Sequence, residues 1–243
     1  MKLSVVICTK NRPMDFKKTA DSLKKQSFDD WELVVIKQSP LSKARDLGWR
    51  KAQGEIVSFI DDDVLLDKDW AKNLVAIFHK HPEVGGVSGP TIVPEHLLKN
   101  RLIFWWYGRR DLLAKLWVKL LLDNRPMDVG KITQHGWWSP GSNFKSCLKN
   151  KGLIEVDYLE ACNMSLRRQL IEQVGGFDLK FAGTSEWCEL DLAMRIKKLG
   201  YRLVWSSEVK IEHLVSRDGV FVERRNWPER VKNYLRFRKK HLL

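Results

Sequence analysis

Residues 56–63 read IVSFIDDD, an apolar, β-branched run that ends in three consecutive carboxylates. The run predicts a buried strand with charged side chains at its end. Like charges at this density repel one another and need an offsetting positive charge. A divalent cation with oxygen ligands, Mg²⁺ or Mn²⁺, would supply it. The alternative is a solvated turn that leads into the helix beginning at Trp70.

Strand and helix patterns alternate on both sides of this run. Strands are expected at 3–8, 31–36 and 84–88, and helices at 13–26, 42–52 and 70–79. Short links between alternating strands and helices predict parallel pairing with right-handed crossovers. We therefore expect an α/β fold with a Rossmann-like, mostly parallel central sheet flanked by helices. Ligands of such sheets bind at the carboxyl ends of the strands.

The net charge of +13 is concentrated in two blocks. Residues 97–152 hold 11 basic and 3 acidic residues, and residues 214–243 hold 9 and 3. The first block interrupts the alternation and predicts a helical aromatic and basic insertion, with a helix at 112–122. The second predicts a basic amphipathic helix at 226–243. We expect one domain over 1–243, with a first half at 1–96 and a second half at 153–213.

Aromatic and basic side chains together suit the headgroup region of an anionic membrane. In the insertion they are Trp105, Trp106, Tyr107, Trp117, Trp137 and Trp138 with Arg109, Arg110, Lys115, Lys119 and Arg125. In the tail the basic ones are Arg224, Arg225, Arg230, Lys232, Arg236, Arg238, Lys239 and Lys240. The alternative is an aromatic lid over a substrate site and a solvated tail helix. A near-neutral body without a recognised motif argues against a nucleic-acid-binding module.

The expected location is cytoplasmic, with a peripheral position on the inner face of the cell membrane left open. The N-terminus begins as a strand and lacks the apolar region and cleavage site of a signal peptide. No window is long and apolar enough for a membrane-spanning helix. The four cysteines are scattered without a C-x-x-C pair, which favours reduced thiols.

A second acidic group lies at residues 185–191, which read SEWCELD at the start of a predicted helix. Its carboxylates are Glu186, Glu189 and Asp191. Carboxylates in a first helical turn are favoured by the helix dipole, and one of them could also serve as a general base. Farther along, His213 follows a strand expected at 209–212 and is either a metal ligand or a structural histidine.

Several short motifs in order resemble an inverting family 2 glycosyltransferase with the GT-A fold. They run from residue 3 to residue 213, and the ordered set is far more specific than any one motif. The motifs are VVICTKNRP at 5–13, ARDLG at 44–48, AQGE at 52–55, FIDDD at 59–63, CNMS at 162–165, GGFD at 175–178, ELDL at 189–192 and GYR at 200–202.

This resemblance implies metal-dependent transfer of a hexose from a nucleotide-diphosphate donor to a saccharide or lipid-linked saccharide, in cell-surface polysaccharide or glycan synthesis. The cofactor would be Mn²⁺ or Mg²⁺, held by Asp63, Asp61 and His213. Residues 1–96 would form the nucleotide-binding half and residues 153–213 the acceptor and catalytic half. The implied nucleotide contacts are Thr9, Asn11, Arg12, Lys37, Arg45, Asp61 and Asp62. The implied acceptor and sugar contacts are Asn163, Trp187, Trp137 and Trp138. By register the general base falls on Glu189, with Glu186 and Asp191 as alternatives.

The chain departs from the family pattern at two points. Lys37 stands where the family has an aspartate that helps to read uracil, which disfavours a uridine donor and leaves guanosine and thymidine diphosphate sugars open. Cys188 precedes Glu189 where the family has an acidic residue. A non-catalytic protein that binds nucleotide sugars is therefore the alternative function.

Overall fold

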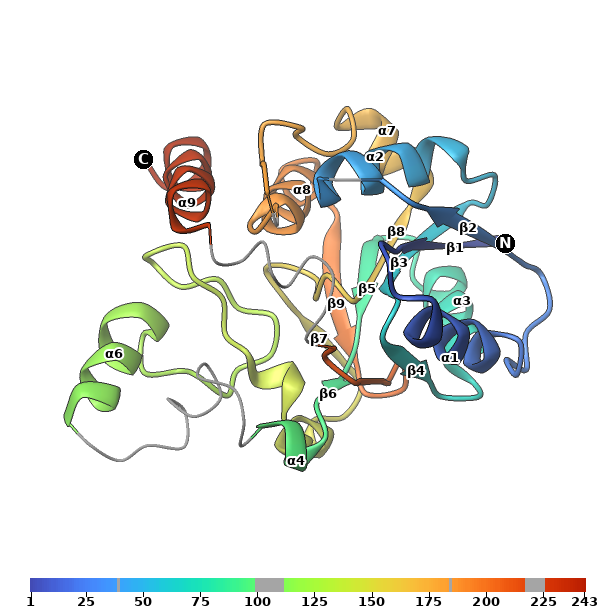
Figure 1. The fold of residues 1–243 in the computed structure, drawn as a ribbon, viewed down its shortest axis with the longest axis horizontal. Coiled ribbons are helices and arrows are strands. Elements are labelled where there is room, and N and C mark those ends of the chain that lie inside the picture. The colour runs from blue at the N-terminus through green and yellow to red at the C-terminus, as the bar shows by residue number, and fades with distance from the viewer. Residues whose placement is uncertain (39, 99–111, 184, 217–225) are drawn as a thin grey trace.

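The computed structural model describes residues 1–38, 40–98, 112–183, 185–216 and 226–243. Its centre is a seven-stranded sheet with the strand order β2-β1-β3-β8-β5-β9-β7 (Figure 1). The strands are β1 (Leu3–Cys8), β2 (Trp31–Ile36), β3 (Ile56–Asp61), β5 (Val84–Ser88), β7 (Leu153–Glu155), β8 (Asn163–Arg167) and β9 (Arg202–Ser206).

Five of the seven strands of the central sheet run in one direction, in agreement with the mostly parallel sheet that we predicted, and β7 and β8 run in the opposite direction. β1 pairs in parallel with β2 and β3, and β5 pairs in parallel with β9. β8 is antiparallel to both β3 and β5, and β7 is antiparallel to β9. Strand β8 is absent from our prediction, although its short sequence NMSLR alternates polar and apolar residues. The Ser165 hydroxyl of β8 forms a hydrogen bond with that of Ser58 on β3 at 2.6 Å.

A second, three-stranded sheet lies beside the first, with the order β4-β10-β6. Its strands are β4 (Val64–Leu66), β10 (Ile211–His213) and β6 (Thr91–Ile92). The strand that we predicted at 209–212 is therefore shifted by one to two residues. The register pairs His213 with Val64, which brings the histidine next to the acidic run.

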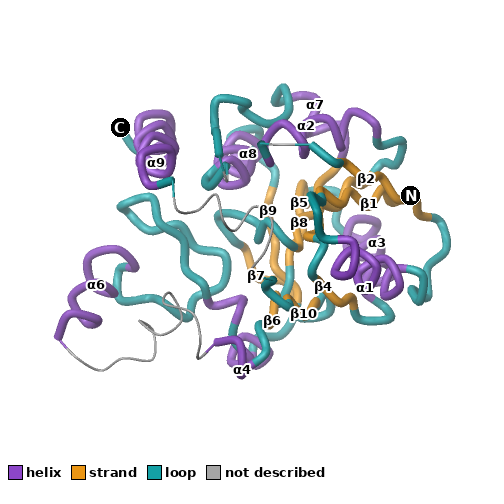
Figure 2. The backbone as a smooth tube through the Cα atoms, in the orientation of Figure 1, coloured by secondary structure: helices purple, strands orange, loops and turns teal. Residues whose placement is uncertain are grey.

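Helices cover both faces of the central sheet (Figures 1 and 2). One core contains side chains of α1 (Pro13–Leu23) and α3 (Trp70–Lys80). The other core contains side chains of α2 (Leu41–Lys51), α7 (Arg168–Gln173) and α8 (Cys188–Lys197). Strands buried on both faces need continuous apolar runs, and β1 is such a strand.

The insertion contains α4 (Glu95–Leu98), α6 (Leu112–Leu122), and two 3₁₀ turns at Gly141–Asn143 and Lys145–Lys149. The helix predicted at 112–122 is confirmed. The residues 105–107, 109 and 110 of the predicted aromatic and basic patch lie outside the described residues. Strand β7 ends at Glu155, and the backbone N–H of Asp157 donates to the carbonyl of Gly130 at 2.7 Å.

The basic tail forms α9 (Trp227–His241), close to the predicted bounds. Arg224 and Arg225 lie outside the described residues. Phe237 of α9 is fully buried in the core that contains α8. The tail is thus part of the packed domain, and its prediction as a solvated helix is wrong for this face.

All four cysteines are free thiols, and three of them are buried. Among the described residues, no helix is both long enough and apolar enough to cross a lipid bilayer.

Candidate active site

The acidic run sits where the carboxyl ends of two parallel strands meet. Asp61 is the last residue of β3 and is paired in register with Cys8, the last residue of β1. Next to them, β8 begins at Asn163, and β10 ends at His213. Ligands of α/β sheets bind at this edge, so the topology itself marks the candidate site.

Asp62 holds the loop that follows β1. Its carboxylate accepts hydrogen bonds from the Thr9 hydroxyl and an Arg12 guanidinium N–H, both at 2.6 Å. Asn11, between them, has φ of +58°, a left-handed conformation that asparagine tolerates and that turns the chain toward Arg12. Burial raises the pKa of Asp62 to about 6, against the opposing effects of Thr9 and Arg12. Asp62 therefore acts on this loop as a buried anchor.

Asp63 is also buried, and three groups of the protein surround it. Arg12 donates to Oδ2 at 2.5 Å, the Ser216 backbone N–H donates to the same oxygen at 2.7 Å, and His213 Nε2 lies 3.3 Å from Oδ1. Burial opposes ionisation, but the hydrogen bond and charge of His213 and the charge of Arg12 outweigh it and hold the pKa of Asp63 well below its usual range. Arg12 thus supplies part of the positive charge that we expected a metal ion to supply.

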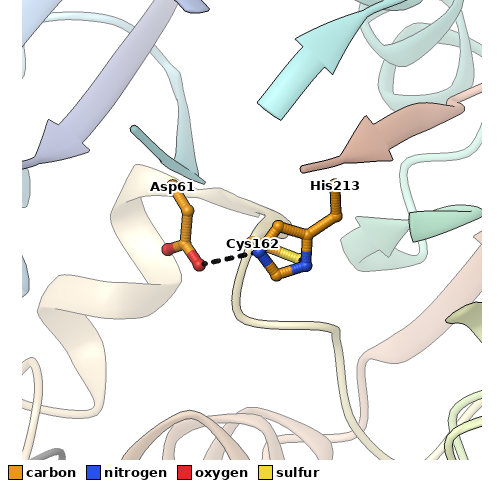
Figure 3. A group of neighbouring side chains, drawn as sticks. All are labelled: Asp61, Cys162 and His213. Carbon is orange, nitrogen blue, oxygen red and sulfur yellow. Dashed lines mark hydrogen bonds and ion pairs between the residues drawn. The ribbon is translucent and has the colours of Figure 1, made fainter. Parts of the chain in front are cut away.

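Asp61 is the most accessible carboxylate of the run, with a side chain 35% exposed. It forms a group with Cys162 and His213 in which one ligand atom from each lies within 4.8 Å of the others (Figure 3). His213 Nε2 is 3.9 Å from Asp61 Oδ2, so one imidazole nitrogen lies between two carboxylates. Asp63 Oδ1 is buried and accepts no hydrogen bond of good geometry from the part of the chain that the structure describes.

These donors fit a divalent cation such as Mn²⁺. Two carboxylates and an imidazole are acceptable ligands for it, and the poorly bonded Asp63 oxygen would gain a partner. The Cys162 thiol is a softer group, and burial raises its pKa. Its sulfur forms a hydrogen bond with His213 Nδ1 at 3.7 Å.

Arg45 of α2 joins the acidic run to the start of α8. Its side chain is buried, and its guanidinium lies 4.0 Å from Asp61 and 3.7 Å from Glu189. It also donates to the sulfur of Cys188 at 3.5 Å. Burial opposes its charge, but the neighbouring Cys188, Glu189 and Asp61 raise the pKa of Arg45, so it stays protonated. Glu189 is therefore brought to the same edge as Asp61.

The other two carboxylates of this segment face the tail helix. Asp191 is fully buried, and its oxygens accept from Arg195 at 2.8 Å, Lys240 at 2.7 Å and His241 at 2.7 Å. Glu186 pairs with Arg230 of α9 at 2.5 Å. Both carboxylates therefore pair with cations of the tail helix, which favours a structural role for them, and Glu189 stays the predicted base.

Two expected sugar contacts are structural instead. The Asn163 amide is fully buried, accepts from the Trp70 indole at 3.0 Å and donates to the carbonyl of Val209 at 2.8 Å. Trp187 is 1% exposed, and its indole N–H donates to the carbonyl of Gly136 at 2.8 Å. Neither side chain is accessible to a substrate, so both expectations are corrected.

Trp137 and Trp138 are half-buried and belong to an aromatic cluster around Trp187. Trp137 and Trp138 stack with ring centroids 5.9 Å apart, and each meets Trp187 edge-on, at 5.5 and 5.4 Å. Tyr234 of α9 completes the cluster. Trp187 is the residue directly before α8, so the cluster adjoins the start of the helix that carries Glu189. Lys37, by contrast, is exposed just after β2.

Glu160 is a site residue that our sequence analysis missed. It is buried near Glu189 and His213, and the Tyr158 hydroxyl donates to it at 2.7 Å. Burial raises the pKa of Glu160 to about 7, reinforced by the charge of Glu189 and opposed by His213. An acidic residue inside the apolar stretch before the CNMS motif is the signal that could have revealed it.

Three solved structures share this architecture. A mannosyltransferase, PcManGT from Pyrobaculum calidifontis in complex with GDP-Man and Mn²⁺, aligns with a TM-score of 0.60 and 17% identity, over 98% of this chain and 63% of its own. GalNAc-T7 with UDP, GalNAc and Mn²⁺ also gives 0.60, with 14% identity, over 98% and 48%. TarS from S. aureus gives 0.53, with 16% identity, over 92% and 38%. At these identities the likeness concerns the fold, which is that of GT-A glycosyltransferases.

A curated relative, the uncharacterized protein y4gI of Sinorhizobium fredii, is 21% identical over 165 residues. That match covers 67% of this chain and only 16% of the relative. The family profile described as Glycosyl transferase family 2 matches residues 37–174, more than half of the chain. The matched range contains the acidic run, Arg45 and the start of β8. The chain therefore belongs to glycosyl transferase family 2.

Proposed function

We propose that this protein is a metal-dependent, inverting hexosyltransferase that uses a nucleotide-diphosphate sugar as donor. The acceptor is a saccharide or lipid-linked saccharide, and the product enters a cell-surface polysaccharide or another glycan. One observation carries the proposal: the buried guanidinium of Arg45 lies 4.0 Å from Asp61 and 3.7 Å from Glu189. Arg45 thus lies between Asp61, the carboxylate expected on the donor side, and Glu189, the candidate base.

On the donor side, Asp61, Asp63 and His213 are the residues that would hold Mn²⁺ or Mg²⁺. When bound, the ion offsets the negative charge of the diphosphate as the nucleotide leaves. Binding of the ion by His213 would require a neutral imidazole, so a proton on the ring nitrogen that faces Asp63 would be released.

The loop after β1 supplies the nucleotide contacts in this proposal. Asp62 ties Thr9 and Arg12 together, so the loop is held in one shape before the donor arrives. Asn11 is exposed at the tip of the turn. Lys37 lies just after β2, which neighbours β1, and would meet a base carbonyl or a phosphate. A lysine in place of an acidic uracil reader favours a guanosine or thymidine donor.

In the chemical step, Glu189 takes the proton of an acceptor hydroxyl while that oxygen attacks the anomeric carbon. The bond between this carbon and the diphosphate oxygen breaks, and its electron pair leaves with the nucleoside diphosphate. Attack opposite the leaving group inverts the anomeric configuration. Arg45 positions Glu189, and Trp137 and Trp138 contact the acceptor.

A thermal-shift screen tests the donor side. UDP, GDP, dTDP and CDP are each added with and without Mn²⁺, because a ligand of the folded state raises the melting temperature by mass action. We expect one nucleotide to stabilise the protein only with the ion, and Asp61→Asn to abolish that effect. Asp21→Asn, on the far side of α1, is the matched control. No stabilisation by any of the four nucleotides would refute the proposal.

The variant Glu189→Gln separates binding from chemistry. It should keep the metal-dependent nucleotide shift and release nucleoside diphosphate from the matching sugar nucleotide about 10²–10⁴-fold more slowly, the usual contribution of a general base. Wild-type turnover by this variant would remove Glu189 from its role. A wild-type protein that binds the sugar nucleotide but turns over none with any saccharide acceptor would favour the non-catalytic alternative.

A further inference from the structure

The largest exposed apolar side chains of this protein are concentrated on two helices. Among the described residues, twelve large hydrophobic side chains are exposed, and seven of them lie on α6 and α9. On α6 they are Leu112, Leu113, Leu116 and Leu120, and on α9 they are Trp227, Val231 and Leu235. Scattered exposed hydrophobics need no explanation, but a concentration of this kind marks an interaction surface.

Each helix presents these side chains as a stripe. Leu112, Leu116 and Leu120 are four residues apart, with exposures of 80%, 48% and 53%. Residues four apart lie on one helix face. The exposed face of α6 also carries Lys115 and Lys119, while Leu122 is buried. The helix thus has a second apolar face that no described residue covers.

The tail helix repeats the arrangement. Trp227, Val231 and Leu235 are again four residues apart, with exposures of 64%, 50% and 57%. Its buried face, with Asn233 and Phe237, is a different one and packs on the domain. Exposed Lys232 and Lys239 stand beside the stripe, and Lys232 also pairs with Glu229 at 2.8 Å.

Both helices lie at the same end of the molecule. Figure 1 places α6 and α9 at one end of its longest axis, and the N-terminus at the other. The two helices lie in residues 97–152 and 214–243, the two blocks that hold most of the excess positive charge. Apolar stripes with leucine and tryptophan, bordered by lysine and arginine, are what an interfacial helix needs on an anionic bilayer.

We infer that α6 and α9 together form a docking surface for an anionic lipid bilayer. The charge complementarity selects the lipid surface, because lysines beside each stripe would be buried unpaired against an identical basic face of a second copy. α9 also reaches the candidate active site, since Arg230 pairs with Glu186 and Asn233 bonds the backbone of Ala182. If the proposed function holds, docking orients the acceptor side of the site toward lipid-linked saccharides.

Vesicle flotation tests this inference independently of catalysis. We expect the wild-type protein to float with phosphatidylcholine–phosphatidylglycerol vesicles and much less with phosphatidylcholine alone. Leu116→Glu/Leu120→Glu on α6 and Val231→Glu/Leu235→Glu on α9 should each lower the partition coefficient at least tenfold. Each lost lysine–lipid attraction, as in Lys115→Gln, should lower it about fivefold.

The matched control is Met14→Glu/Leu179→Glu, which changes charge by the same amount at exposed apolar positions elsewhere, with exposures of 68% and 52%. It should float as the wild type does, and unchanged melting temperatures verify that every variant is folded. The inference is overturned if the wild type does not float at low salt, or if the control loses as much binding as the stripe variants. It is equally overturned if the wild type dimerises through these stripes and ignores vesicles.

Discussion

The substitution Asp191→Asn tests whether this carboxylate holds the fold together or takes part in catalysis. Asp191 is fully buried and contacts Arg195, Lys240 and His241, of which His241 is fully buried as well. Asparagine has the same shape but no charge, so the variant leaves Arg195 and Lys240 without their counter-ion. Breaking a buried ion pair in this way costs about 3–5 kcal/mol.

The lower end of that range applies here, because the side chain of Lys240 is 37% exposed and can turn to water. A loss of about 3 kcal/mol lowers the melting temperature of a domain of this size by about 6–12 °C. Urea unfolding at neutral pH, followed by tryptophan fluorescence, measures the free-energy difference directly. Asp178→Asn is the control, since Asp178 pairs with the same Lys240, at 3.3 Å, but on the surface.

The effect of Asp191→Asn has a defined pH dependence. Burial opposes ionisation of Asp191, but the hydrogen bond from His241 and the charges of Arg195 and Lys240 lower its pKa below the ordinary value. A carboxyl group whose pKa is lower in the folded state stabilises the fold above its unfolded pKa of about 4. The difference in the free energy of unfolding between wild type and variant should therefore reach its full value above about pH 5 and decrease as the pH falls below 4.

The opposite pattern would refute this reasoning. If Asp191→Asn melts like the wild type and loses turnover by the factor expected of a general base, the carboxylate is catalytic, and Glu189 is not the base.

Three further predictions follow from the geometry. Gly89→Ala should destabilise the protein by about 1–3 kcal/mol, as overpacking does, because its Cβ would lie 2.1 Å from the carbonyl oxygen of Val209; chemical denaturation measures this. Trp187→Phe should cost about 1–3 kcal/mol, since the buried carbonyl of Gly136 loses its donor, and a normal melting temperature would contradict the structural role. Chelation by EDTA should erase the nucleotide-dependent thermal shift, and added Mn²⁺ should restore it; a shift that survives chelation would exclude the ion from donor binding.

Much of the fold is readable from local sequence. The strands at 3–8, 31–36 and 84–88 and the helix at 112–122 are found with the predicted bounds. Each is specified by apolar periodicity within a short window. Strand β8 escapes prediction because its position between β3 and β5 comes from pairing with residues about 80 to 110 positions away.

The candidate site, like the fold, could be predicted only in part from local sequence. Asp61, Asp62 and Asp63 stand out in the sequence because three adjacent charges at the end of an apolar run are costly without a partner. The sequence does not show the different environments of these three carboxylates, because Arg12 and His213 approach them from distant segments. The sequence also indicates Glu189 as the first candidate for the base, with Glu186 and Asp191 as alternatives, but it does not show the ionic partners of these carboxylates.

The sequence by itself determined the α/β architecture, the acidic run at a strand end and the basic, aromatic character of the insertion and tail. These depend on periodicity and on composition, which are local properties. Only the tertiary structure decided that cations of α9 form ion pairs with Glu186 and Asp191. It also decided that Arg45 lies between Glu189 and Asp61. The reason is physical: the role of a carboxylate depends on its burial and its ionic partners, and both arise from contacts between segments far apart in the chain.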